Sequence, residues 1–257
     1  MGELPDSPLE IGKMLRVAAS FAVGEKMKIH GFQKLTLLDY PGKVACTLFT
    51  GGCNFRCPFC QNAGLVLAPD KEPLIKQDEI MAVLKKRQGI LEGICVTGGE
   101  PTLNEDLPEF LHTVKRMGYK VKLDTNGYRP QVLKQLVKEE LVDYVAMDIK
   151  NCPEKYAATA GITYLDVDKI KESAEFLMRG SLEYEFRTTV CRELHQKADL
   201  LAIGKWLRGS KRYYLQPYRE SPNVIRPVFT SYTKEQMHQF KNMLSHDIPW
   251  TEVRGMD

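Results

Sequence analysis

Three cysteines in one short stretch are the residues of this sequence best suited to chemistry. Cys53, Cys57 and Cys60 follow a Cys-x3-Cys-x2-Cys spacing within residues 50–62, which read TGGCNFRCPFCQN. Spacings of two and three residues allow one curling loop to aim several thiolates at a small inorganic core, so the loop predicts an iron–sulfur site. Three thiolates leave one iron of a four-iron cluster without a protein ligand. That iron is open to a substrate or cofactor.

A structural zinc site is the alternative reading of the same cysteines. Zinc takes four tetrahedral ligands, usually from two close pairs, and Cys46 is the candidate for a fourth ligand. Cys46 lies within the strand-like run 44–49, however, where the strand rather than the loop fixes its direction. A disulfide framework is disfavoured because the cysteines crowd into one loop of a long chain that lacks a secretory signal.

The elements that position this loop alternate between strand-like and helical patterns. Strand-like runs cover 44–50, 93–97, 120–124, 144–149, 183–190 and 212–216, and helical patterns cover 75–87, 107–117, 130–140, 167–178, 197–207 and 232–244. This alternation is typical of parallel βα units, whose right-handed crossovers place the helices outside a curved sheet. Six units predict an α/β fold, a partial (βα)6 barrel. An open doubly wound sheet is the alternative.

Polar clusters follow the predicted strands at the points where the strands end. The first strand runs directly into the cysteine loop, and the later strands end in or carry Thr97-Gly-Gly-Glu-Pro101, Asp124-Thr-Asn-Gly127, Asp148-Ile-Lys150, Arg187-Thr-Thr189 and Gln216-Pro-Tyr-Arg219. In barrels of parallel strands the chemistry gathers at the carboxyl ends, because the βα loops converge there. All of these clusters are therefore expected on one face of the barrel.

The cysteine loop resembles the signature of the radical S-adenosylmethionine (SAM) enzymes, in which an aromatic residue such as Phe59 precedes the third cysteine. The resemblance implies a 4Fe-4S cluster whose open iron is chelated by the amino and carboxylate groups of SAM. It also implies that one electron from the cluster cleaves the sulfonium to give a 5′-deoxyadenosyl radical. In such enzymes the cofactor carries the hard chemistry, while the protein positions and shields it.

The same resemblance implies roles for the polar strand ends. Gly98 and Gly99 let the backbone approach a ligand closely, and Glu100 is expected near the amino group of SAM. Lys150 is expected near the SAM carboxylate, unless it only pairs with Asp124 or Asp148. The other expected cofactor contacts are Asp124 and Asn126 near the ribose or a neighbouring cation, Phe59 and Gln61 beside the cluster, Asp148, Arg187, and Gln216 and Arg219 toward the adenine.

Two further stretches resemble the activating proteins of the anaerobic ribonucleoside-triphosphate reductases. They are residues 31–43, GFQKLTLLDYPGK, and the continuation Cys60-Gln61-Asn62. This resemblance implies an enzyme that leaves a glycyl radical on a large partner enzyme and receives electrons from a donor such as flavodoxin or ferredoxin. One alternative is a small-molecule enzyme such as 7-carboxy-7-deazaguanine synthase, which usually carries Asp-Thr where Gln61-Asn62 stand. The other is a non-enzymatic iron–sulfur or zinc module.

Length and composition indicate one main domain. Of the 257 residues, 1–26 are predicted to form an N-terminal extension and 27–257 the radical SAM domain. A net charge of +3 is too small to indicate nucleic-acid binding. No apolar run approaches the ~20 residues that span a bilayer, and the seven cysteines without a secretory signal favour the cytoplasm.

The remaining cysteines and histidines show no metal-ligand spacing. Cys46, Cys95 and Cys191 lie in or at the ends of apolar runs and are predicted core residues, whereas Cys152 follows Lys150 and its role stays open. His112 and His195 are expected at the surface or in loops.

Overall fold

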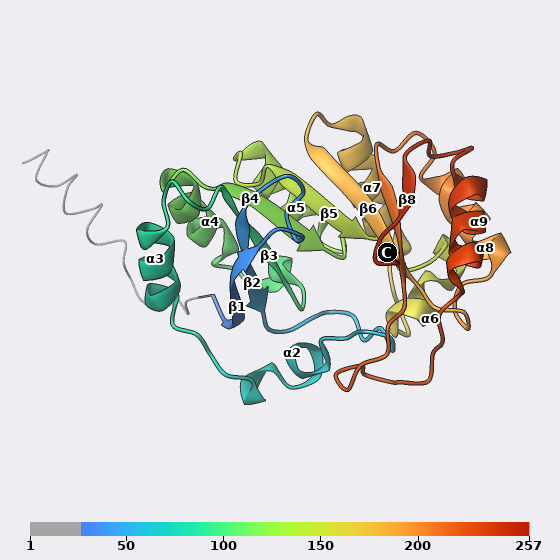
Figure 1. Ribbon diagram of the computed structural model, residues 1–257, viewed down its shortest axis with the longest axis horizontal. Helices are drawn as coiled ribbons and strands as arrows, with labels where there is room; N and C mark the ends of the chain where they lie inside the picture. The colour runs from blue at the N-terminus through green and yellow to red at the C-terminus, as the bar shows by residue number, and fades with distance from the viewer. Residues whose placement is uncertain (1–26, 257) are drawn as a thin grey trace, which may run out of the picture.

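The computed structural model describes residues 27–256 as an α/β fold built on one curved sheet (Figure 1). The sheet has eight strands in the order β1-β2-β3-β4-β5-β6-β7-β8, so each strand lies beside its neighbour in sequence. β1 runs antiparallel to β2, and every later pair is parallel. A doubly wound sheet would reverse its strand order at a switch point. The sequential order therefore confirms the barrel-type prediction. The predicted extension at residues 1–26 lies outside the described residues.

The strands and helices of the six predicted βα units are all present, with bounds that differ by at most two residues, and the strand-like pattern of residues 28–32 belongs to a strand that ends four residues later. The strands are β1 (Ile29–Thr36), β2 (Ala45–Thr50), β3 (Gly93–Gly98), β4 (Lys120–Thr125), β5 (Tyr144–Asp148), β6 (Glu183–Val190), β7 (Tyr213–Pro217) and β8 (Thr251–Val253). The helices are α2 (Ala63–Leu67), α3 (Gln77–Lys86), α4 (Leu107–Arg116), α5 (Pro130–Lys138), α6 (Tyr156–Ala160), α7 (Val167–Arg179), α8 (Lys197–Trp206) and α9 (Lys234–Leu244). Short 3₁₀ turns are η1 (Pro69–Lys71), η2 (Pro101–Leu103) and η3 (Pro153–Lys155).

Three short elements were not predicted from the sequence. α2 and α6 have five residues each, and β8 has three, so none is long enough to show a clear periodicity. β8 extends the parallel sheet beyond the six predicted strands by pairing with β7 through Tyr213↔Thr251 and Leu215↔Val253. The sheet is therefore one parallel strand wider than six βα units require.

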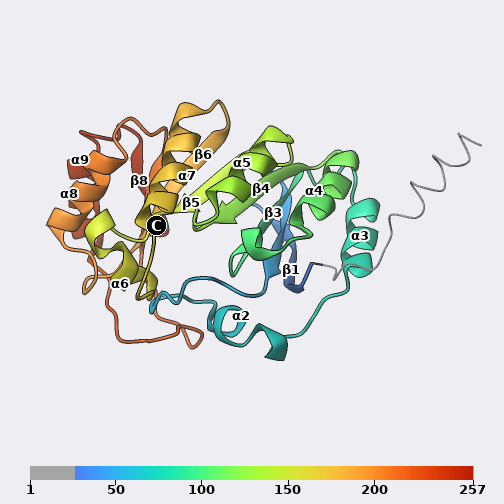
Figure 2. The same cartoon turned by 180° about the vertical axis from the view of Figure 1, so that it is seen from behind.

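The two faces of the sheet differ in polarity. Val96, Leu123 and Met147 are fully buried in the apolar core, whereas Asp124 and Asp148 line a cavity on the other face. Successive side chains of a strand point to opposite faces. Each strand thus supplies apolar residues to the helix-covered side, where Figure 2 shows α4, α5 and α7, and polar residues to the barrel interior.

α4 illustrates how the helices cover the sheet. Its buried residues, Leu107, Phe110, Leu111 and Val114, follow the three- and four-residue spacing of one helix face. Burying each such side chain contributes about 1.5–3 kcal/mol. Among the helices of the described chain, none combines the length and apolar character needed to cross a membrane.

Candidate active site

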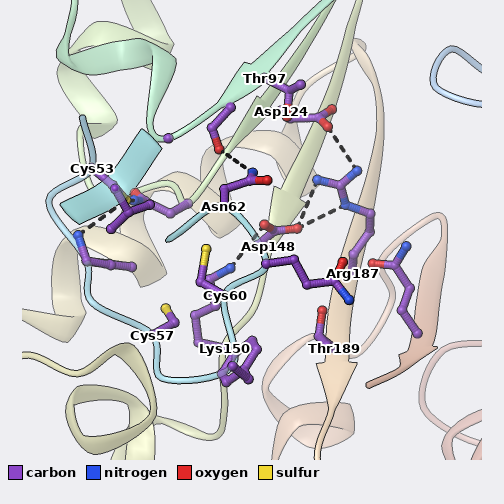
Figure 3. Close-up of a pocket in the computed structure, with 18 of the residues that line it drawn as sticks. Cys53, Cys57, Cys60, Asn62, Thr97, Asp124, Asp148, Lys150, Arg187 and Thr189 are labelled. Carbon is purple, nitrogen blue, oxygen red and sulfur yellow. Dashed lines mark hydrogen bonds and ion pairs between the residues drawn. The ribbon is translucent and has the colours of Figure 1, made fainter. Parts of the chain in front are cut away.

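A cavity of about 480 Å³ lies at the carboxyl ends of the parallel strands (Figure 3). All three loop cysteines line it, together with polar residues from five successive strand ends. Every site residue predicted from the sequence is among the residues that line it, namely Cys53, Cys57, Phe59, Cys60, Gln61, Gly98, Gly99, Glu100, Asp124, Asn126, Asp148, Lys150, Arg187, Gln216 and Arg219. The fold therefore brings the predicted constellation together on one face.

Neighbouring segments hold the cysteine loop by its backbone. The Arg56 N–H donates to the carbonyl of Ala160 in α6 at 2.9 Å. On the other side, the N–H groups of Ile225 and Arg226 donate to the carbonyls of Cys60 at 3.0 Å and Pro58 at 2.8 Å. The loop is thus fixed from both flanks by parts of the chain far away in sequence.

The three cysteines differ in burial. Cys57 is buried, and Cys53 and Cys60 are partly exposed to the cavity. Burial raises the pKa of the Cys57 thiol to about 12 and that of Cys53 to about 11. Within the described residues, no three cysteine, histidine or carboxylate side chains converge on one metal position.

Gly98 and Gly99 are required by the chain's own backbone. Gly98 has a φ of +114°, which disfavours any side chain, and a Cβ on Gly99 would overlap the carbonyl oxygen of Gly52. The Gly98 carbonyl accepts a hydrogen bond from Asn62 Nδ2 at 2.9 Å. The end of β3 therefore packs directly against the start of the cysteine loop.

Glu100 is buried and ties two strand ends together. Its Oε1 accepts hydrogen bonds from Thr102 and from Thr125 Oγ1 at 2.7 Å, and its Oε2 accepts one from the Asn126 N–H at 2.7 Å. Burial raises the pKa of this carboxyl, and the hydrogen bonds oppose the shift. Asn126 in turn donates to Asn54 Oδ1 at 2.8 Å, so Glu100 also supports the cysteine loop.

Arg187 lies between two carboxylates that face the cavity (Figure 3). Its Nη1 donates to Asp124 at 3.1 Å and its Nε to Asp148 at 2.9 Å. Burial opposes ionisation of Asp124, but Arg187 and Lys122 outweigh it and hold its pKa at about 2. The pKa of Asp148 is also lowered, against burial, by Arg187 and Lys150.

Lys150 pairs with Asp148, one of the two partners considered for it, and also lines the cavity. Its Nζ donates to Asp148 Oδ2 at 3.1 Å, and the side chain, 16% exposed, lines the cavity with the cysteines. Burial opposes its charge, but Asp148 and Cys57 raise its pKa above the ordinary value. Its carbonyl accepts a hydrogen bond from His195 Nε2 at 2.7 Å. The lysine is thus fixed at both backbone and side chain.

Comparison with known proteins shows which family this chain belongs to. A family model described as the radical SAM superfamily matches residues 47–188, more than half of the chain and nearly all of the cavity's strand ends. The chain belongs to the radical SAM superfamily. Membership implies an iron–sulfur cluster and S-adenosylmethionine.

Two curated relatives and one solved structure are similar to this chain. A protein of Methanocaldococcus jannaschii, provisionally named a glycyl-radical enzyme activating enzyme, is 30% identical over 203 residues, which span 75% of this chain and 80% of that protein. The anaerobic ribonucleoside-triphosphate reductase-activating protein of Salmonella typhi is 31% identical over 93 residues, or 35% of this chain and 60% of that protein. The structure of TYW1 with a lysine-pyruvate adduct shares the fold, with a TM-score of 0.61 at 16% identity over 94% of this chain and 90% of that one.

The donor set fits a radical SAM cluster. Three thiols from one loop line the same cavity, and iron binding deprotonates a coordinating thiol that burial otherwise keeps neutral. Lys150, Arg219 and Arg254 also line the cavity, and their cationic groups suit the carboxylate and polar groups of SAM.

Three further residues line the cavity, and the sequence assigned none of them a cofactor role. Asn62 and Thr189 belong to clusters expected on this face, and Thr189 follows Arg187 by two residues on a strand, so both were within reach of the sequence. Arg254 was missed entirely, and it makes a bidentate pair with the buried Glu185 at 2.9 and 3.0 Å. Nothing local marks Arg254, because β8 brings it to the barrel.

The other cysteines and histidines have structural surroundings. Cys46, Cys95 and Cys191 are fully buried, as predicted for core residues, and Cys152 is buried with its sulfur 3.9 Å from Asp199 Oδ1, outside the cavity. His195 lies in a loop, one of the two places predicted for it, but it is not at the surface. Its loop folds under Lys150, so the ring is completely buried.

Proposed function

We propose that this protein is a radical SAM activase that generates a glycyl radical on anaerobic ribonucleoside-triphosphate reductase. The observation that carries the proposal is that Cys53, Cys57, Cys60 and Lys150 line one cavity. The similarity to a provisionally named glycyl-radical activating enzyme over most of both chains supports the substrate class. The Salmonella typhi relative supports the choice of reductase.

In this proposal Cys53, Cys57 and Cys60 hold a 4Fe-4S cluster, and the cavity residues hold SAM. Lys150 binds the carboxylate, and Gly98, Gly99 and Glu100 lie on the side of the amino group. When bound, the cluster supplies one electron that cleaves SAM to methionine and a deoxyadenosyl group, which takes one hydrogen from the partner's glycine. Residues 27–257 form the radical SAM domain and residues 1–26 an extension to it.

The open side of the barrel suits a macromolecular substrate. β1 and β8 are the two edges of the sheet and do not pair with each other among the described strands. An extended peptide of the partner enters there, and its docking excludes water from the site as a lid does in other enzymes. A donor such as flavodoxin or ferredoxin supplies the electron, and the proposed compartment is the cytoplasm.

Electron paramagnetic resonance tests this function directly. The reconstituted, reduced protein with SAM is expected to produce a glycyl radical signal only when the reductase is added. With the reductase's radical glycine changed to Ala, the signal should vanish while slow formation of 5′-deoxyadenosine persists. Rapid and tightly coupled turnover of a small molecule by the isolated protein would instead contradict the activase assignment.

A further inference from the structure

Lys122 is a buried cation beneath the cavity that no sequence motif marked. It lies on β4 with its side chain 2% exposed, and it is not among the residues that line the cavity. Its Nζ pairs with Asp124 Oδ1 and lies 3.6 Å from Cys95 Sγ. A lysine is almost never buried this deeply unless it is paired, so the ion pair with Asp124 accounts for its position.

The Lys122 pair is the inner end of a continuous row of alternating charges. Asp124 Oδ2 accepts from Arg187 Nη1 at 3.1 Å, and the Arg187 guanidinium continues to Asp148 Oδ1 at 2.9 Å. Asp148 Oδ2 accepts from Lys150 Nζ at 3.1 Å. Each carboxylate uses one oxygen for each neighbouring cation. A change at one end therefore alters the partners available along the row.

We propose that Lys122 is a positioning residue for S-adenosylmethionine, acting through Asp124, Arg187 and Asp148 on the Lys150 ammonium. By holding Asp124 from below, Lys122 leaves Arg187 free to share its charge with Asp148. Asp148 is then only partly engaged by Lys150. The Lys150 ammonium therefore remains able to pair with a second carboxylate, one bound in the cavity.

Loss of Lys122 is expected to redistribute these pairs in one direction. Asp124 would retain a single cation and draw Arg187 toward itself, because a buried carboxylate without its partner is costly. Asp148 would then depend more on Lys150 and hold it more tightly. The SAM carboxylate would then be bound less strongly by Lys150, although no residue in contact with SAM had been replaced. This inference rests on the proposed SAM site.

The test measures the dissociation constant of SAM by anaerobic calorimetry, with the cluster reconstituted, in wild type and Lys122→Met. Met matches the length of the lysine stem without its charge. We expect about tenfold weaker binding, within the range of coupling between members of one ion-pair network. Lys120→Met is the matched control, because Lys120 lies two residues earlier on β4 and pairs with Asp143 at 2.8 Å on the exposed surface. It should bind SAM as wild type does.

A double-mutant cycle separates positioning from a general loss of packing. In the Asp124→Asn background the row is already broken, so adding Lys122→Met should not weaken SAM binding further. Equal losses in both backgrounds, or an unchanged dissociation constant in Lys122→Met, would overturn the inference. If Lys122→Met alone does not fold, Lys122→Gln, which also removes the charge but can still donate a hydrogen bond to Asp124, takes its place in both backgrounds of the cycle. Failure of the wild type to bind SAM would instead reject the proposed function.

Discussion

The α-carbon of Gly99 lies so close to the backbone of Gly52 that any side chain at position 99 would overlap the Gly52 carbonyl oxygen. Gly52 immediately precedes Cys53, the first cysteine of the loop, and its carbonyl accepts a hydrogen bond from the Glu100 N–H at 2.8 Å. The glycine at position 99 therefore lets β3 support the cysteine loop. Its substitution should act on the loop before it acts on a bound cofactor.

Gly99→Ala is expected to displace the cysteine loop and reduce cluster assembly. Forcing a methyl group into a filled space typically costs about 1–3 kcal/mol, so the free energy of unfolding of the apoprotein should fall by that amount. Iron per chain after anaerobic reconstitution should fall with it. Gly180→Ala is the control, because a Cβ there meets its nearest backbone atom at 3.3 Å. Full iron content in Gly99→Ala would show that the loop tolerates the displacement.

Each of the single substitutions Cys53→Ala, Cys57→Ala and Cys60→Ala should abolish the cluster, whereas Cys46→Ala should retain about four irons per chain. Cys46 is fully buried on the apolar face of β2 and does not line the cavity. Iron analysis and the visible absorption of reconstituted protein provide the measurement. If the site binds only zinc and requires Cys46, the proposed iron–sulfur cluster and its radical chemistry are excluded.

Lys150→Ala should weaken SAM binding by about tenfold or more while the cluster assembles normally. A hydrogen bond to a charged group contributes about 1.5–3 kcal/mol, and the Lys150 side chain, only 16% exposed, presents its ammonium on the cavity wall. Lys155→Ala serves as the control, since Lys155 is half exposed and pairs with Asp199 at 2.7 Å. Equal affinity in Lys150→Ala and wild type would mean that the lysine only neutralises Asp148.

The buried His195 should cause the free energy of unfolding of the apoprotein to fall when the pH is lowered into the mildly acidic range. Burial lowers the pKa of His195 below its ordinary 6.5, although its hydrogen bonds to the Lys150 and Cys191 backbone oppose the shift. A lowered folded pKa means that the stability is complete above about pH 6.5 and is lost as the pH falls through the folded value. His195→Gln can still donate to the Lys150 carbonyl but does not titrate. Measured by urea unfolding between pH 8 and 5.5, the free energy of unfolding of His195→Gln should change less with pH than that of wild type.

The half-exposed His112 on α4 supplies the matched control for this pH experiment. His112→Gln should preserve the wild-type dependence of unfolding free energy on pH. An unchanged slope in His195→Gln would show that the buried ring does not resist protonation.

The local features of this protein were readable from the sequence. The cysteine spacing confines three thiols to one loop whatever surrounds it, and the strand and helix patterns repeat within windows of 5–13 residues. Because parallel βα units place all strand ends on one face, the positions of Glu100, Asp124 and Lys150 on the cavity followed from the units alone. These inferences depend only on near neighbours in the chain.

Tertiary structure decided which of these groups contact one another. Arg187 reaches Asp124 across 63 positions and His195 reaches Lys150 across 45, and the support of the cysteine loop by Ile225 and Arg226 depends on where the chain returns after β7. Side-chain type specifies a charge or a donor, but the partner depends on strand register and on the packing of loops at the barrel mouth. Neither the strand register nor the loop packing can be predicted from a local sequence pattern. Lys122 carries no local signal, and only the position of β4 between β3 and β5 buries it beside Asp124.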